Sequence, residues 1–235
     1  MAAAAIQMIL TRPEGANERF ATALSEQVRS RVTIIESPLI TITPVPYDDH
    51  PAPEAAIFTS ANGVRFAPNG NGRPAFCVGE ATQDAAKTRG WAAQALGSDA
   101  GSLVTRLMAL KPAGTIRHYR GEHTRGEVED RLRRSGLSVD AQTVYDQRET
   151  ALSDAAQGAL SGQGPVIVPL FSPRTARIFA AQRRGSAPIW VAAMSDAVAA
   201  EASELAPDRM ITAAEPTLLA MAQAVEKLIH LTHAG

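Results

Sequence analysis

Short apolar runs in this sequence repeatedly end in a hydroxyl or glycine residue just before a helical pattern. Two such runs lead into Thr59-Ser60 and Ser172-Pro173. The start of a helix leaves backbone N–H groups unpaired and carries partial positive charge, so it can bind a carboxylate or phosphate. Helix capping alone would favour the same residue types. Because the pattern recurs, we expect these turns to bind one polyanionic ligand.

The candidate binding residues are those that stand at these turns. They are Thr11, Arg12, Ser60, Ala61, Asn62, Gly63, Thr82, Ser102, Arg120, Gly121, Ser172 and Ser195. Asn62 and Gly63 would let the Ser60 turn approach a carboxylate closely. Ser102 and Thr217 each stand before an amphipathic pattern, which predicts that they are helix N-caps.

The elements that must position these residues form a repeated α/β pattern. Apolar runs alternate with helical segments, which predicts βαβ units and parallel sheets. In such sheets ligands bind beyond the carboxyl ends of the strands, where every candidate turn is expected to lie. The landmarks of the first half recur in order in the second half, at an offset of about 110 residues, which indicates two related halves.

Two extended segments mark the seams between the halves. Residues 38–46 and 141–150 alternate apolar and polar residues, and the prolines of the first make a central strand a poor interpretation. We interpret them as a pair of linker strands. The chain is then an α/β protein with two parallel-sheet domains, a discontinuous one made of residues 1–37 and 151–235 and a continuous one of residues 47–140.

Composition and missing motifs exclude several classes of function. The net charge of −1 gives no reason to expect nucleic acid or a membrane surface as partner, and no apolar segment is long enough to span a bilayer. Walker A, dinucleotide, zinc and serine-hydrolase patterns are missing, so no known motif points to a cofactor or metal. Cys77 is interpreted as a buried thiol in a cytoplasmic protein, and His118 as a core or edge histidine, with catalysis as its alternative. Nothing demands a partner subunit, so a monomer is expected.

Taken together, the motifs resemble the uroporphyrinogen-III synthase family. They follow the family's order and span nearly the whole chain, although each is weak alone. The segments that carry the resemblance are LTRPEGANERFATAL, SPLITITPV, FTSANGVRF, CVGEATQDAAKTRGW, YRGEHTRGEVEDRLRRSGLSV, VYDQRE, LFSPRTARIF and AAEPTLLAMAQAV.

The resemblance implies a fold and a reaction. The fold is two flavodoxin-like domains joined by a two-stranded linker. The reaction, that of a cofactor-independent hydro-lyase in tetrapyrrole biosynthesis, closes linear hydroxymethylbilane in the interdomain cleft, with loss of water and inversion of ring D. The substrate carries four acetate and four propionate groups, which suits a site built from helix starts. By the same resemblance Tyr145 is the catalytic acid that assists the departing hydroxyl, and Thr82 binds substrate. The alternatives are that Tyr145 only packs at the hinge and that Thr82 is a helix N-terminal cap.

One segment departs from the family pattern. Where a glycine and a threonine are common after a strand of the second half, this chain has Ser195 and Val198, and Asp196 adds negative charge. A non-catalytic paralogue that binds a tetrapyrrole or another polycarboxylate is therefore the alternative function. A two-domain sugar- or anion-binding protein is a third hypothesis, weakened by the lack of aromatic residues at the turns.

Overall fold

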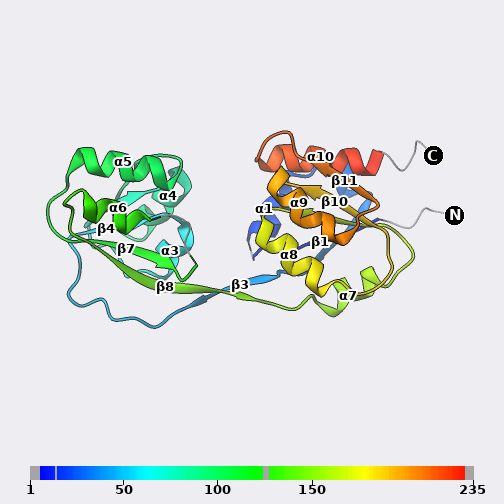
Figure 1. Ribbon diagram of the computed structural model, residues 1–235, viewed down its shortest axis with the longest axis horizontal. Helices are drawn as coiled ribbons and strands as arrows, with labels where there is room; N and C mark the ends of the chain where they lie inside the picture. The colour runs from blue at the N-terminus through cyan, green and yellow to red at the C-terminus, as the bar shows by residue number, and fades with distance from the viewer. Residues whose placement is uncertain (1–5, 14, 124–126, 231–235) are drawn as a thin grey trace. The chain divides into compact units, whose positions relative to one another are not determined.

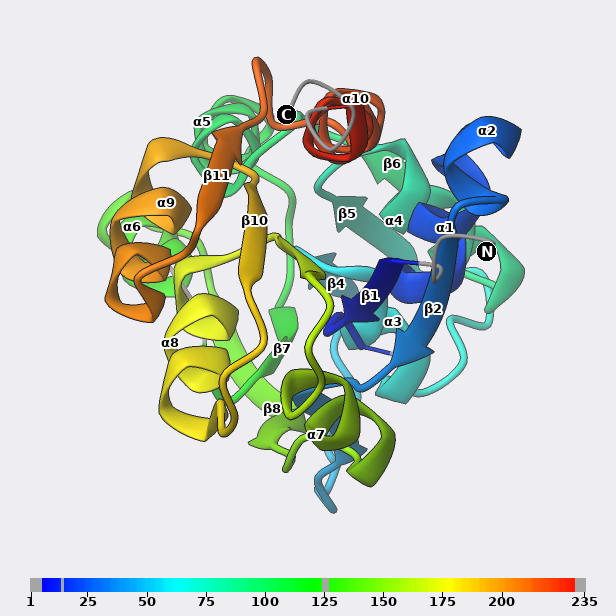
Figure 2. The ribbon, with the colours of Figure 1, turned by 90° about the vertical axis from the view of Figure 1, so that its right-hand side faces the viewer.

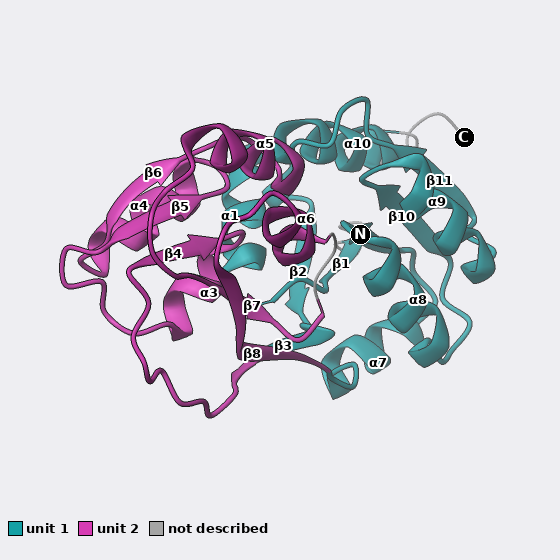
Figure 3. Ribbon diagram, turned by 60° about the vertical axis from the view of Figure 1, so that its left-hand side comes forward, with its two compact units in different colours: residues 1–41, 149–235 teal, residues 42–148 magenta. Residues whose placement is uncertain are grey.

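A computed structural model describes residues 6–13, 15–123 and 127–230 (Figure 1). The chain forms two compact units, shown in separate colours in Figure 3: unit 1 consists of residues 1–41 and 149–235, and unit 2 of residues 42–148. Unit 2 is thus an insertion in the sequence of unit 1. Among the described residues, no helix is long and apolar enough to cross a membrane.

Unit 1 contains a five-stranded sheet in the order β11-β10-β9-β1-β2, and its neighbouring strands run parallel. Its strands are β1 (Ile6–Leu10), β2 (Val32–Glu36), β9 (Val166–Leu170), β10 (Ile189–Ala193) and β11 (Arg209–Thr212). Its helices are α1 (Ala16–Ala23), α2 (Glu26–Arg29), α7 (Asp154–Leu160), α8 (Pro173–Gln182), α9 (Asp196–Ala202), the 3₁₀ helix η1 (Ser203–Leu205) and α10 (Leu218–His230).

Helices cover both faces of this sheet (Figure 2). On one face, Phe20 of α1 and Met221 and Val225 of α10 pack against strand residues such as Met8 in one core cluster. On the other face α8 packs on β9, and α9 packs on β10. Every residue of β9 and β10 is buried, which explains why both strands are apolar runs without polar alternation.

Unit 2 contains a six-stranded sheet in the order β3-β8-β7-β4-β5-β6. Strands β4 to β8 pair in parallel. The strands are β3 (Ile40–Pro44), β4 (Ala55–Phe58), β5 (Pro74–Cys77), β6 (Ala92–Ala95), β7 (Ile116–Gly121) and β8 (Val139–Glu149). The helices are α3 (Ala61–Phe66), α4 (Glu80–Thr88), α5 (Ala100–Leu110) and α6 (Val128–Arg134).

This second sheet is also covered on both faces. Val64 of α3 and Ala86 of α4 belong to the cluster on one face, and Leu103 of α5 and Leu132 of α6 belong to the cluster on the other. β3 lies at the edge of the sheet, where a proline costs no ladder hydrogen bond. The prediction of an α/β protein with parallel sheets is therefore confirmed.

The strand order also follows the internal repeat predicted from sequence. Numbered along the chain, the strands of unit 1 lie in the order 2-1-3-4-5. When β7 and β8 are counted first, strands β7, β8, β4, β5 and β6 of unit 2 lie in that same order. The two units thus share one topology, and the N-terminal strand pair of unit 1 corresponds to the C-terminal strand pair of unit 2.

Helix starts follow local capping chemistry, with one correction. The side chains of Ser60 and Ser172 accept hydrogen bonds from backbone N–H groups of the helices that they precede, and Thr217 accepts one from Ala220 at 3.2 Å. The prediction that Ser102 is an N-cap is wrong. Asp99 is the N-cap of α5, and Ser102, three residues later, completes a capping box with it.

Candidate functional site

In unit 2 the predicted residues gather at the carboxyl edge of the sheet. Because β4, β5, β7 and β8 are parallel, the turns that follow β4, β5 and β7 lie along one edge. Ser60 follows β4 and is partly exposed, with its hydroxyl accepting from the Asn62 amide at 3.1 Å. Ala61 is exposed beside it. This edge presents a hydroxyl and backbone amides at the start of a helix.

Gly63 has a packing role that the sequence did not indicate. A Cβ atom at this position would lie 2.5 Å from the backbone oxygen of Tyr119, so only glycine allows α3 to approach β7 this closely. Gly63 itself is buried. The expected role, close approach of the Ser60 turn to a carboxylate, is therefore not needed to explain this glycine.

Thr82 and Ser102 lie in the first turns of their helices. Thr82 is the third residue of α4 and is 6% exposed, with Gly79 as the N-cap. The Ser102 hydroxyl donates to the backbone oxygen of Asp99 at 2.9 Å, and the Ser102 amide donates to the Asp99 carboxylate at 2.8 Å. The Ser102 hydroxyl is thus engaged by its own helix start, which accounts for this residue by capping.

Tyr145 and Gly121 are direct neighbours across β7 and β8. They are partners in the strand register, next to an irregularity between Arg120 and Gly121. A Cβ atom on Gly121 would lie 2.6 Å from the Tyr145 ring and 3.0 Å from its hydroxyl oxygen, so the ring covers the glycine. The ring of Phe66 packs against the ring of Tyr145, with 6.1 Å between the two ring centroids. Tyr145 is 6% exposed, and no described residue hydrogen-bonds to its hydroxyl. The phenol is held in place by packing, and a phenolic O–H group can donate a hydrogen bond.

In unit 1, the predicted residues Arg12 and Ser172 follow the neighbouring strands β1 and β9. The Arg12 guanidinium lies over the ring of Phe171, 4.1 Å from its centroid, and Phe171 directly precedes Ser172. Burial, and then the charge of Arg19, lower the pKa of Arg12. A partly desolvated guanidinium fixed on an aromatic face is well suited to bind a carboxylate.

Other residues support this edge of unit 1. Thr11 is 1% exposed, and its hydroxyl has no hydrogen-bond partner in the described chain. Asn17 was not predicted. Its buried side chain accepts from the Arg12 amide at 3.0 Å and donates to the Leu10 oxygen at 3.1 Å, which fixes the turn after β1. An asparagine in the first turn of a helix that follows a strand is the signal that could have indicated it.

Ser195 occupies the N-cap position of α9, but its side chain makes no capping hydrogen bond. Asp196 is exposed at the first position of this helix, and Val198 is buried. The segment that departs from the family pattern therefore places a carboxylate where an anionic ligand was expected.

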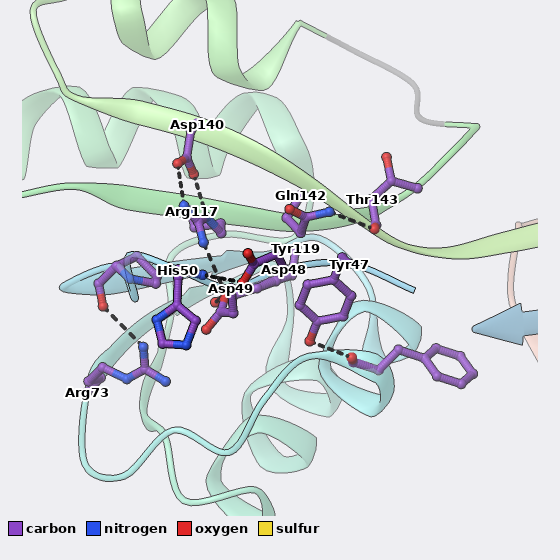
Figure 4. A network of polar contacts seen from close by, with 12 residues as sticks. Tyr47, Asp48, Asp49, His50, Arg73, Arg117, Tyr119, Asp140, Gln142 and Thr143 are labelled. Carbon is purple, nitrogen blue, oxygen red and sulfur yellow. Dashed lines mark hydrogen bonds and ion pairs between the residues drawn. The ribbon is translucent and has the colours of Figure 1, made fainter. Parts of the chain in front are cut away.

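A polar network on β7 holds residues 45–54, the extended segment between β3 and β4, against the sheet of unit 2 (Figure 4). Arg117 binds Asp140 through two hydrogen bonds, of 2.9 and 2.7 Å, and Asp49 through one of 3.1 Å. The Tyr119 hydroxyl donates to Asp49 at 2.5 Å. Burial and the hydrogen bond to Asp49 raise the pKa of Tyr119, and the hydrogen bond to Asp140 raises the pKa of Arg117 despite burial. This arrangement leaves few donors for a ligand, so its role is structural.

Replacing Arg117 with leucine is expected to lower the free energy of unfolding by about 2 kcal/mol, because Asp49 and Asp140 lose a charged donor and both are only partly exposed. Urea denaturation measures the change. The control is Arg134→Leu, which removes an ion pair of exposed side chains to Glu127 and is expected to change stability by less than about 0.5 kcal/mol. Equal effects of the two substitutions would contradict the structural role of the network.

Two further sequence predictions concern single residues. Cys77 is buried, as expected, and burial raises the pKa of its thiol to about 12. A thiol in this state is not a nucleophile near neutral pH. His118 is also buried, but it contacts Thr59 and Glu129 through its two ring nitrogens. Among the residues that the structure describes, no group of three or more His, Cys, Asp or Glu side chains could hold a metal ion.

Comparison with known proteins gives one consistent result. A family model described as uroporphyrinogen-III synthase HemD matches residues 19–223. A search of curated proteins finds no match. The fold is similar to that of uroporphyrinogen-III synthetase from Helicobacter pylori 26695, with 16% identity and a TM-score of 0.65, over 95% of this chain and 99% of the other. It is also similar to a mutant uroporphyrinogen III synthase from the extremely thermophilic bacterium Thermus thermophilus, with 14% identity and a TM-score of 0.53, over 97% and 100%.

Proposed function

The chain belongs to the uroporphyrinogen-III synthase family, and from that premise we propose that it converts hydroxymethylbilane to uroporphyrinogen III. In this reaction the linear tetrapyrrole loses water and closes to a ring with ring D inverted, which makes the protein a hydro-lyase. The family match and the shared fold support the proposal and do not favour the non-catalytic alternative. We further propose that the protein works in the cytoplasm as a monomer without a cofactor.

The observation that carries this proposal is the recurrence of anion-binding chemistry at the strand ends of both units. Ser60 in unit 2 and Arg12 with Ser172 in unit 1 lie at carboxyl edges of parallel sheets. A substrate with four acetate and four propionate groups needs many fixed donors, and charge-assisted hydrogen bonds to amides and guanidinium supply them. We propose that these edges bind the substrate carboxylates.

The same premise extends to the domain organisation. We propose that the two units are flavodoxin-like domains, and that residues 38–46 and 141–150 link them. The strand order of each unit, 2-1-3-4-5, supports the assignment. So does the path of the chain, which passes from unit 1 into unit 2 within β3 and returns at the end of β8.

In the proposed mechanism the protein mainly fixes one conformation of the bilane. The Tyr145 phenol donates a hydrogen bond to the departing hydroxyl, and loss of water leaves an electrophilic azafulvene. The substituted position of ring D attacks it, and the resulting spiro intermediate fragments and recloses with ring D inverted. Since the bilane also closes unaided to the unrotated isomer, positioning is the larger part of the task. Thr82 is proposed as a binding residue beside the strand-end turns.

The test of this function is the isomer that the protein forms. Hydroxymethylbilane is generated in situ, the protein is added, and the oxidised products are separated by chromatography. Mainly type III product is expected. Only type I product, matching a control without protein, would exclude the synthase activity and would leave the binding paralogue as the function.

Substitution of Arg12 by glutamine is expected to raise the KM for hydroxymethylbilane about tenfold, with little change in kcat, because one charged donor to a substrate carboxylate is lost. Arg12→Lys is expected to recover only part of the loss, since an ammonium does not reproduce the planar guanidinium on Phe171. The coupled assay measures both constants. The control Arg29→Gln changes an exposed arginine of α2 and should leave KM unaltered.

A further inference from the structure

A chain of hydrogen bonds runs from a largely buried carboxylate to a hydroxyl at the carboxyl end of β4. The Nδ1 atom of His118 lies 2.8 Å from Oε1 of Glu129, and its Nε2 atom lies 3.1 Å from the Thr59 hydroxyl. His118 is 1% exposed. Arg120 forms an ion pair with the same Glu129 oxygen at 3.3 Å. Thr59 directly follows β4, His118 and Arg120 belong to β7, and Glu129 belongs to α6.

The charge on Glu129 fixes the direction of these hydrogen bonds. Burial, the largest single cause, raises the pKa of Glu129. The hydrogen bonds with His118 and with its own backbone amide, and the nearby positive charge of Arg120, act in the opposite direction, and the pKa is lowered to about 2. An ionised carboxylate only accepts, so Nδ1 of His118 carries a proton. In neutral His118, Nε2 is then an acceptor, and the Thr59 hydroxyl donates to it.

The surroundings show that packing alone does not call for these polar groups. On this face of the sheet, Ile57 and Ile116 lie beside His118, and Val128 and Leu132 flank Glu129 in the same helix. Apolar side chains would fill such a space at lower desolvation cost than a carboxylate and an imidazole. Thr59, by contrast, is partly exposed and stands directly before Ser60, at the edge where ligands of open α/β sheets bind.

We propose that Thr59 is a further binding residue for a substrate carboxylate, and that His118 and Glu129 are positioning residues that turn its hydroxyl towards the ligand. This inference rests on the proposed function for the identity of the ligand. When a substrate carboxylate binds, the hydroxyl proton of Thr59 turns from Nε2 of His118 towards the ligand. Nε2 takes up one proton from solvent and donates it to the Thr59 oxygen, while Glu129 compensates the imidazolium charge. One proton is gained, and no bond between heavy atoms changes.

The charged groups around His118 fit this exchange. Among the described residues, Glu129 faces it from α6, Arg120 of β7 acts on it through Glu129, and the uncharged Thr59 contacts it from the turn after β4. A carboxylate that binds at Thr59 would add a second negative charge near the imidazole. Binding and proton uptake are then favourably coupled, since each lowers the free energy cost of the other.

The direct test follows the His118 nitrogens by NMR in protein labelled with ¹⁵N-histidine. The probe is uroporphyrin III, the stable oxidised macrocycle with the same eight carboxylates. In the free protein at mildly alkaline pH, we expect a protonated Nδ1 and an unprotonated Nε2. With saturating uroporphyrin III we expect Nε2 to become protonated. In Glu129→Gln, which removes the compensating charge, His118 is expected to stay neutral when the probe binds.

Kinetics provide a second test through Thr59. Thr59→Val, which keeps the shape and removes the hydroxyl, is expected to raise KM about tenfold with kcat within about twofold of wild type. Thr59→Ser keeps the hydroxyl and should restore KM. The matched control is Thr105→Val, an exposed threonine of α5 whose hydroxyl bonds only to Gly101 of its own helix. If Thr59 had only a structural role, Thr59→Val would lower the melting temperature without changing KM.

The outcomes separate this inference from the proposed function. If uroporphyrin III binds and the His118 nitrogens do not respond, the role of His118 and Glu129 is wrong. An unaltered KM in a stably folded Thr59→Val protein would likewise overturn the role of Thr59. A wild-type protein that forms no type III product but still shows proton uptake at His118 would refute the synthase activity alone. If the wild-type protein neither binds uroporphyrin III nor forms type III product, both proposals are overturned.

Discussion

Tyr145→Phe is expected to lower kcat for type III product about 100-fold, the scale of a positioned general acid, with little change in KM. The reason is that the substitution removes only the phenolic oxygen, while the ring keeps its packing on Gly121 and Phe66. Because no described residue hydrogen-bonds to that oxygen, the free energy of unfolding should change by less than about 0.5 kcal/mol. The isomer-resolved assay and urea denaturation measure the two quantities.

Tyr119 offers a matched control for this prediction. It is also a buried tyrosine of unit 2, but its hydroxyl donates to Asp49. Tyr119→Phe is therefore expected to cost about 1 to 2 kcal/mol of stability, since a hydrogen bond to a charged acceptor is lost, and to leave kcat unaltered. If Tyr145→Phe kept full activity, Tyr145 would be a packing residue and another group would have to assist the departing hydroxyl.

Gly121→Ala is expected to lower kcat by about one to two orders of magnitude, through displacement of the Tyr145 hydroxyl. An added methyl group would lie 2.6 Å from the ring, so the ring must move. Small displacements of a reacting group carry large kinetic costs. Since both substitutions act on one hydroxyl, the double variant Gly121→Ala/Tyr145→Phe should be no slower than Tyr145→Phe alone, as a double-mutant cycle would show.

The control for this prediction is another glycine-to-alanine change. Gly158 lies in α7, and a Cβ atom there would meet nothing within 4 Å. Gly158→Ala is expected to preserve kcat and to stabilise the protein by a few tenths of a kcal/mol up to about 1 kcal/mol, because alanine favours the helix. If Gly121→Ala and Tyr145→Phe instead reduced kcat independently, the glycine would act on the reaction by a different route.

Local chemistry made much of the fold predictable. Apolar runs such as residues 166–170 became fully buried strands because both faces of a parallel sheet are covered. Serine before a helical pattern predicted the caps at Ser60 and Ser172, since capping involves residues two or three apart. The same argument failed for Ser102, because aspartate at position 99 competes for the cap and serine suits the third helical position equally well.

Pairings between distant residues could not be predicted. Asp49 and Arg117 are 68 residues apart, and Thr59 and His118 are 59 apart. Their contact depends on the order of strands in the sheet and on which face each side chain meets. His118 was expected to be a core or edge histidine, because it lies in an apolar strand, and the structure shows that it is buried. No pattern in the chain indicated that Glu129 and Thr59 would satisfy its two nitrogens, since neither stands in a recognisable motif with it.

The insertion of unit 2 within unit 1 has a consequence for protein synthesis. β1 and β2 leave the ribosome early, but β1 pairs on its other side with β9, which begins only at Val166. Two parallel strands alone are not stable, so they must wait on the order of ten seconds of translation. The described strands and helices of unit 2, except the end of β8, lie before residue 149, so this unit can fold during the wait. In a nascent chain stalled after unit 2 has emerged and before β9 has emerged, unit 2 is expected to resist protease while the apolar residues of β1 remain accessible to a chaperone.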